Sequence, residues 1–175
     1  MAECRKNSIS EYSKEINEDM SVYLPLNIIT NVKQKENQSI RELIIEGIAR
    51  VVMKLDPTIH VNNYKGWVLR VASGKAGLTI ESWMYKSLSF FVGVTASGRK
   101  AKDTILSILK TNNEFIISSI GHSFSIKGGN KNPDSIWIES EIIYDKNKQL
   151  VEIIEVLASE YFSAINLFSS LIKRY

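Results

Sequence analysis

Residues 88–110 read LSFFVGVTASGRKAKDTILSILK, and within them the pattern changes from that of a strand to that of a helix. The first nine residues are almost entirely apolar, which is typical of a central strand covered on both faces. Ser97 and Gly98 end this strand, and apolar residues then recur at the spacing of an amphipathic helix. The stretch therefore predicts a sheet strand that leads directly into a helix.

Strand patterns continue on both sides of this stretch. Before it, Trp67, Leu69 and Val71 alternate with Val68 and Arg70, as in a strand with one buried face. A glycine-containing turn then leads to a second apolar segment at 78–85. After it, residues 123–127 and 135–143 predict two more strands, joined by a loop rich in Gly and Asn. Because most of these connections are hairpins, we expect a five-stranded, mainly antiparallel sheet.

Three other segments have helical patterns. Residues 8–19 predict a thinly apolar first helix, and residues 21–32 an edge strand or extended connector interrupted by Pro25. A second helix begins at the capping-box pair Ser39 and Glu42 and ends before a proline. A long final helix covers 150–174. The expected fold is a single α+β domain of residues 1–175, with a helical part at 1–63 and a core at 64–175.

Composition limits the functions that the chain can have. It has 175 residues, a mass of 19.8 kDa and a formal net charge of +3, since 22 basic residues face 19 acidic ones. So mild an excess permits a nucleic-acid partner without requiring one. A single cysteine allows no internal disulfide, and no apolar run approaches the ~20 residues of a membrane span. With no apolar signal segment at the start, we expect a cytoplasmic protein without a membrane contact.

The final helix is apolar around about 240° of its circumference, at ~100° per residue. A surface helix needs an apolar stripe of only ~100° or somewhat more. The excess must be covered by other elements of the chain or by another chain. We therefore expect a protein partner or a homodimer, with an interface formed by Val151, Val156, Phe162, Leu167 and Leu171.

Basic side chains gather at the start of the helix that follows Gly98. Arg99, Lys100 and Lys102 lie in its first turn, where backbone N–H groups favour an anion. Cations at this end oppose the helix dipole, so they do not stabilise the helix. The candidate anion or nucleic-acid site also includes three lysines from two turns, Lys75, Lys127 and Lys131. The alternative is an ordinary solvated helix start.

Patterns of catalysis are weak in this sequence. The two histidines, His60 and His122, are far apart and have no cysteine beside them, whereas zinc needs three or four close ligands. Glu139 and Glu141 share a strand face with Trp137, but the lysine of a metal-dependent nuclease is missing. The glycine-rich residues 127–131 lead into a strand, not into the helix of a phosphate loop. We expect no catalytic residue, metal or cofactor.

The order of three strands, a helix, two strands and a helix over 67–175 resembles an uncharacterised domain of bacterial restriction and defence proteins. In those proteins it lies downstream of endonuclease-like domains, and its helix opens with a turn glycine and lysines, like residues 98–102 here, and runs to a glycine like Gly121. The resemblance implies a bacterial or phage-related defence setting with nucleic acid as a partner. The order is also similar to that of type III secretion chaperones, which are small dimers and typically acidic.

Together these observations indicate a non-catalytic binding or assembly subunit. It would associate with protein through its final helix and with nucleic acid through the basic helix start. Two alternatives stay open: a secretion-type chaperone dimer and a degenerate metal-dependent nuclease.

Overall fold

The computed structural model describes residues 40–128 and 133–175. The expected helix at 8–19, the segment at 21–32 and the capping residue Ser39 lie outside these residues. The elements are, in chain order, α3 (Ile40–Leu55), β1 (Asn62–Tyr64), β2 (Val68–Ala72), β3 (Leu78–Met84), β4 (Phe90–Ser97), α4 (Arg99–Ile120), β5 (Ser125–Gly128), β6 (Ser135–Ile142) and α5 (Leu150–Arg174). The α+β class and the long C-terminal helix are confirmed.

The described strands form one sheet in the order β1-β2-β3-β4-β6-β5, and every neighbouring pair is antiparallel. The expectation of five strands was wrong by one, because the three residues of β1 are too few to show an alternating pattern. This strand folds back on β2, with Tyr64 opposite Val68. The tight connection places both Lys65 and Gly66 at positive φ, 59° and 70°.

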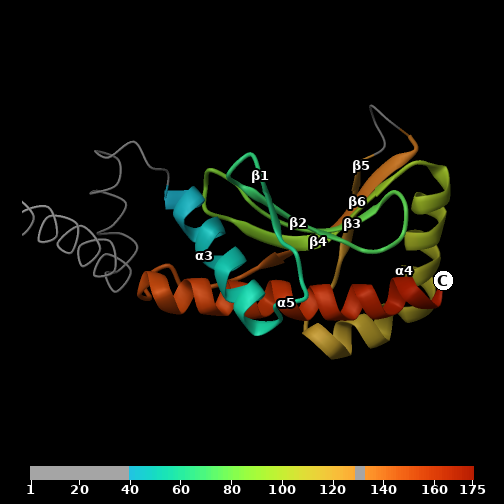
Figure 1. The fold of residues 1–175 in the computed structure, drawn as a ribbon. Helices are drawn as coiled ribbons and strands as arrows, with labels where there is room; N and C mark the ends of the chain where they lie inside the picture. The colour runs from blue at the N-terminus through green and yellow to red at the C-terminus, as the bar shows by residue number, and fades with distance from the viewer. Residues whose placement is uncertain (1–39, 129–132) are drawn as a thin grey trace, which may run out of the picture.

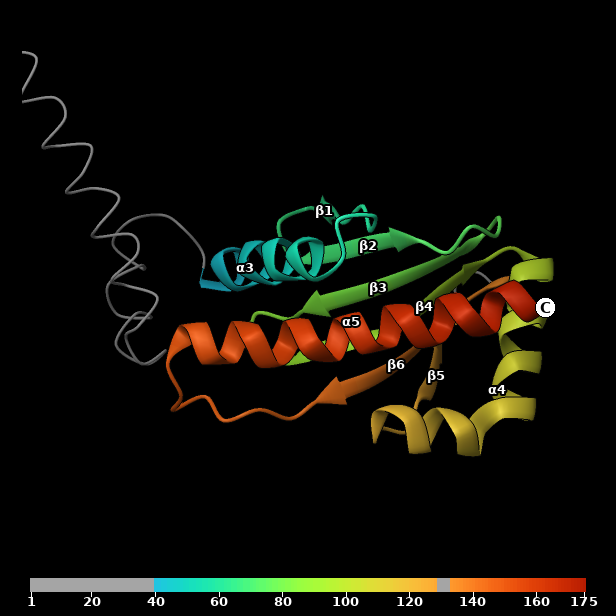
Figure 2. The same cartoon turned by 60° about the horizontal axis from the view of Figure 1, so that its bottom comes forward.

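The three described helices lie on one side of the sheet. In Figure 1, α5 crosses beneath the strands and no described helix crosses above them. Figure 2 shows α3 beside the first half of α5 and α4 near its C-terminal end. The side chain of Ile154 on α5 accordingly sits so close to Gly47 of α3 that an added Cβ there would be 2.6 Å from it.

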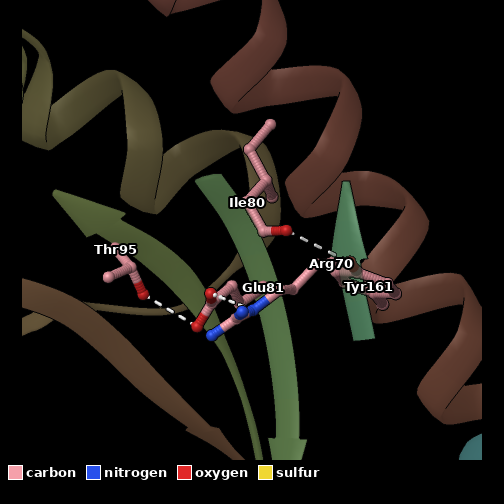
Figure 3. A network of polar contacts seen from close by, with 5 residues as sticks. All are labelled: Arg70, Ile80, Glu81, Thr95 and Tyr161. Carbon is pink, nitrogen blue, oxygen red and sulfur yellow. Dashed lines mark hydrogen bonds and ion pairs between the residues drawn. The ribbon is translucent and has the colours of Figure 1, made fainter. Parts of the chain in front are cut away.

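The core lies between α5 and the helix-facing side of the sheet. Alternate strand residues such as Leu69, Ile80 and Val94 are fully buried there. Tyr161 of α5 is also fully buried, and its hydroxyl donates a hydrogen bond of 3.2 Å to the carbonyl of Ile80 (Figure 3). The hydroxyl is thus paired inside the core, as a buried polar group must be.

Helix α4 is continuous from Arg99 to Ile120, so the residues after Thr111 extend it and do not form a separate helix. It ends at Gly121, whose φ of 72° is left-handed and whose N–H bonds to the carbonyl of Ile117. This is the common glycine termination of a helix.

Candidate binding site on the open face of the sheet

Side chains that alternate with the core residues point to the helix-free face of the sheet. On β2 and β3 these include Arg70, Glu81 and Trp83, and on β4 and β6 they include Phe91, Thr95 and Trp137. The strand register places them in rows across the sheet, with Arg70 opposite Glu81 and Thr95 opposite Trp137. Residues far apart in the sequence therefore meet on one surface.

This face contains an open hollow of about 440 Å³. Half of its ten lining residues are aromatic: Tyr64, Trp67, Trp83, Tyr85 and Trp137. All three tryptophans of the chain are among them. Three of the rings are well exposed, since Tyr64 is 42%, Tyr85 45% and Trp137 38% accessible. Exposed aromatic surface of this kind is a sign of a binding site.

Contacts between rings fix some of the aromatic side chains on this face. Trp83 stacks in parallel on Phe91 with ring centres 6.0 Å apart, and Tyr85 meets the same ring edge-on at 5.2 Å. Such aromatic pairs restrict the orientation of their rings. Part of the surface is therefore already arranged before a ligand arrives.

A polar network crosses the hollow (Figure 3). Arg70 Nε lies 2.8 Å from Glu81 Oε1, and the Thr95 hydroxyl donates a 2.8 Å hydrogen bond to Glu81 Oε2. The Arg70 guanidinium also lies 4.0 Å from the centre of the Tyr64 ring, and Lys65 Nζ lies 5.0 Å from the same centre. Strands β1 to β4 therefore combine to hold one guanidinium group.

The negative charge of Glu81 also affects Tyr161, which lies on the other side of the sheet. Burial raises the pKa of Tyr161 well above its usual value, and the negative charge of Glu81 raises it further. Both effects disfavour the phenolate, because a buried anion beside another anion is unfavourable.

Gly93 lies between two carboxylates in the sheet register. Its register partners are Glu81 on β3 and Glu139 on β6, and a Cβ added to Gly93 would lie 1.9 Å from the Ile138 carbonyl oxygen. The side chain of Glu139 is only 10% exposed, and Lys127 Nζ lies 3.9 Å from its Oε1. Within residues 40–128 and 133–175, Glu139 Oε2 is buried without a hydrogen-bond partner.

The basic residues expected to form one anion site are only partly brought together. Arg99 and Lys100 are exposed in the first turn of α4, whereas Lys102 Nζ donates a hydrogen bond of 2.6 Å to the Pro133 carbonyl. The turn that holds Lys75 lies beside this helix start, since Ser97 N–H donates to the Gly77 carbonyl at 2.8 Å. Lys127 instead belongs to the open face of the sheet, and Lys131 lies outside the described residues.

The residues expected at a protein interface on α5 are mostly covered by the chain itself. Leu167 and Leu171 are buried, and Val151 and Phe162 are half-buried, with Phe162 packed against the core. Of the two expected covers for the apolar excess, the chain's own elements supply that of Leu167 and Leu171. Val156 alone stays well exposed; with Ile143, which is 84% exposed, it lines a second hollow of about 410 Å³.

His122 Nε2 and Glu160 Oε2 are 2.8 Å apart and join the end of α4 to α5, while His60 is exposed. In the described ranges, no group of three or more His, Cys, Asp or Glu side chains is placed to hold a metal ion. None of the helices described is long and apolar enough to cross a membrane.

Comparisons with protein-family models, with curated proteins and with solved structures give no match. The site must therefore be interpreted from its own geometry. The sequence placed Trp137 and Glu139 on one strand face but did not reveal the hollow that Trp137 lines. The signal that it missed is a set of aromatic and charged residues at the outward positions of β2 and β3, such as Arg70, Glu81 and Trp83.

Proposed function

We propose that this chain is a non-catalytic binding protein whose ligand is single-stranded nucleic acid, held on the helix-free face of the sheet. The observation that carries the proposal is the hollow with five aromatic side chains beside Arg70 and Lys65. Unpaired bases stack on aromatic rings, and nearby Arg and Lys side chains contact the phosphates between them. Both kinds of contact are available on this one surface.

An unpaired strand suits this surface better than a duplex. Bases in a duplex are stacked on one another, so their faces cannot reach the rings of Tyr85 and Trp137, whereas splayed bases can. The mild net charge of +3 also fits a ligand held through stacking and a few phosphate contacts, and not through a large basic surface.

The sequence resemblance to a domain of restriction and defence proteins supports the same class of ligand. On this view the protein works in a bacterial or phage-related defence system in the cytoplasm. Arg99 and Lys100 at the start of α4 offer a second place where an extended nucleic-acid strand contacts the protein through its phosphates.

The two alternatives make different predictions. A secretion-type chaperone would be a dimer that does not bind nucleic acid. A degenerate nuclease would cleave in the presence of Mg²⁺, and Glu139→Ala would abolish the cleavage. Association with a protein through α5 would have to use the exposed Val156 with the neighbouring Ile143, since the other apolar residues of α5 are largely covered.

Fluorescence anisotropy with a labelled single-stranded 12-mer tests the proposal. We expect Tyr85→Ala and Trp137→Ala each to weaken binding by about 1–3 kcal/mol, which is the usual contribution of a stacked base. The matched control is Phe115→Ala, because Phe115 is 51% exposed but lies on α4, away from the sheet face. Equal affinity for all four proteins, or no binding by the wild type, would contradict the proposal.

A further inference from the structure

Arg70 is held by two contacts although its side chain is 41% exposed. Its Nε is 2.8 Å from Glu81 Oε1, and its guanidinium plane has the Tyr64 ring 4.0 Å away. Glu81 is fixed in turn by the Thr95 hydroxyl, and its side chain is only 10% exposed. Arg70 therefore has a defined position in the hollow.

The guanidinium has more donors than the protein uses. It carries five N–H groups in a planar fork, one on Nε and two on each terminal nitrogen. Among the residues that the structure describes, Glu81 is its one ionic partner, and Nε is buried without a hydrogen bond although it lies 2.8 Å from Glu81 Oε1. The two terminal nitrogens are left for a ligand. Two parallel N–H groups of this kind match the oxygens of a phosphate or carboxylate.

Glu81 itself is not placed to bind a ligand. Both of its oxygens are engaged, Oε1 by Arg70 and Oε2 by Thr95, and its side chain is nearly buried. An exposed ion pair would be a weak feature, but here the carboxylate is buried and the cation reaches into the hollow. In this pair, Arg70 is the cation that faces the hollow, and Glu81 is the group that orients it.

We propose that Arg70 binds one backbone phosphate of the strand through its two terminal nitrogens, and that Glu81 and Thr95 are its positioning residues. This inference rests on the proposed function, since it names the phosphate contact of the same site. The base next to that phosphate then stacks on the rings that line the hollow.

The salt dependence of binding tests the role of Arg70 directly. For single strands, each phosphate neutralised contributes about −0.7 to the slope of log K against log salt. We expect Arg70→Gln to reduce the slope by about that amount and to weaken binding about tenfold or more, as for a lost bond to a charged group. Arg70→Lys should keep the slope but bind more weakly, because a lysine lacks the fork. Trp137→Ala should weaken binding with the slope unchanged.

Glu81→Gln tests the positioning role through the direction of its effect. Removal of a negative charge next to the site would by itself strengthen the binding of a polyanion. We expect weaker binding instead, because Arg70 loses the group that orients it. Thr95→Val removes the hydroxyl without a change of charge and should weaken binding in the same direction. Thr79→Val is its control, since Thr79 lies opposite Thr95 in the sheet and makes no such bond in the described residues.

The outcomes separate this inference from the proposed function. If the wild type does not bind the strand, both are wrong. If it binds and Trp137→Ala weakens the complex while Arg70→Gln keeps both affinity and slope, the phosphate contact is wrong and the stacking site stands. Tighter binding by Glu81→Gln, with an unfolding transition like that of the wild type, would overturn the positioning role.

Discussion

Glu139 is a carboxylate whose surroundings do little to satisfy it. One oxygen is buried without a hydrogen-bond partner in the described residues, and the other lies 3.9 Å from a half-exposed lysine, Lys127. Burial of an ionised group is costly unless it is well paired, and an exposed partner at this distance returns little. Residues that lower stability in this way are common at binding sites.

We therefore expect Glu139→Gln to raise the free energy of unfolding at pH 7 by about 0.5–1 kcal/mol, since an amide is easier to bury than a carboxylate. Urea denaturation measures the change. Glu141→Gln, on the same strand face but exposed, is the control and should stay within about 0.5 kcal/mol of the wild type. A clear loss of stability in Glu139→Gln would show that Glu139 is paired in solution.

The buried Tyr161 and the partly buried Tyr144 make the fold sensitive to alkali. Burial raises the pKa of Tyr144 to about 12, and it raises that of Tyr161 well above the usual value near 10. Both hydroxyls donate to carbonyl groups, Tyr144 to Leu88 and Tyr161 to Ile80. A phenol whose pKa is higher in the folded state contributes stability fully below the unfolded pKa and loses it as the pH rises.

Stability should accordingly be constant up to about pH 10 and fall between about pH 10 and 12, as the unfolded tyrosines ionise first. Tyr144→Phe should show a smaller fall over the same interval, although its lost hydrogen bond lowers stability at neutral pH. Urea denaturation at pH 8, 10 and 11 measures both. A Tyr144→Phe variant that falls as steeply as the wild type would remove Tyr144 as a cause.

At the residue scale, the sequence could show which face a side chain would share but not what lies beside it. Alternation alone put Trp137 and Glu139 on one side of a strand. Their neighbours depend on the strand order β4-β6-β5. In this order β6 pairs with β4, although α4 and β5 lie between them in the sequence. The contact between Arg70 and Glu81 likewise depends on a register that no local pattern specifies.

Among the elements, the β4–β6 pair depends on a glycine. A side chain at position 93 would overlap the backbone of β6, because its Cβ would lie 1.9 Å from the Ile138 carbonyl oxygen. Backbone atoms of a central strand cannot move aside as a flexible side chain can. The close approach also leaves the space between Glu81 and Glu139 free of a side chain.

Gly93→Ala should therefore lower the free energy of unfolding by about 3 kcal/mol, at the upper end of the usual cost of overpacking. Thermal or urea denaturation measures the loss. Gly74→Ala is a useful comparison, since Gly74 has a φ of 77° but open space around it. It should lose only the conformational cost of about 1–2 kcal/mol. Equal losses in the two variants would show that β4 and β6 can separate.

The elements most clearly predicted were those with long patterns. The strand at 88–96 and the helix after it were evident from their periodicity, whereas β1 was missed because three residues carry no period. The wide apolar face of α5 was also evident from the sequence, but what covers that face was not. An apolar face looks the same in sequence whether its own chain or another covers it, and here α3, α4 and the sheet cover most of it.

For the whole molecule, the remaining apolar surface on α5 is small. It centres on Val156 and the neighbouring Ile143. A stable protein interface buries about 800 Å² on each partner, which is far more than two side chains provide. We therefore expect α5 to form no stable dimer, and light scattering at both low and high salt to give a monomer of 19.8 kDa. A stable dimer that Val156→Glu dissociates would contradict this and favour the secretion-type chaperone.

The most direct test of the account is a titration of the unlabelled protein with a single-stranded oligonucleotide, followed by tryptophan fluorescence. All three tryptophans line the hollow, so a base that stacks there must change their emission. The account predicts saturable quenching by the single strand, weaker quenching by a duplex of the same sequence, and a raised Kd in Arg70→Gln. Binding that leaves the emission unchanged would place the nucleic acid elsewhere, and an absence of binding would refute the proposed function.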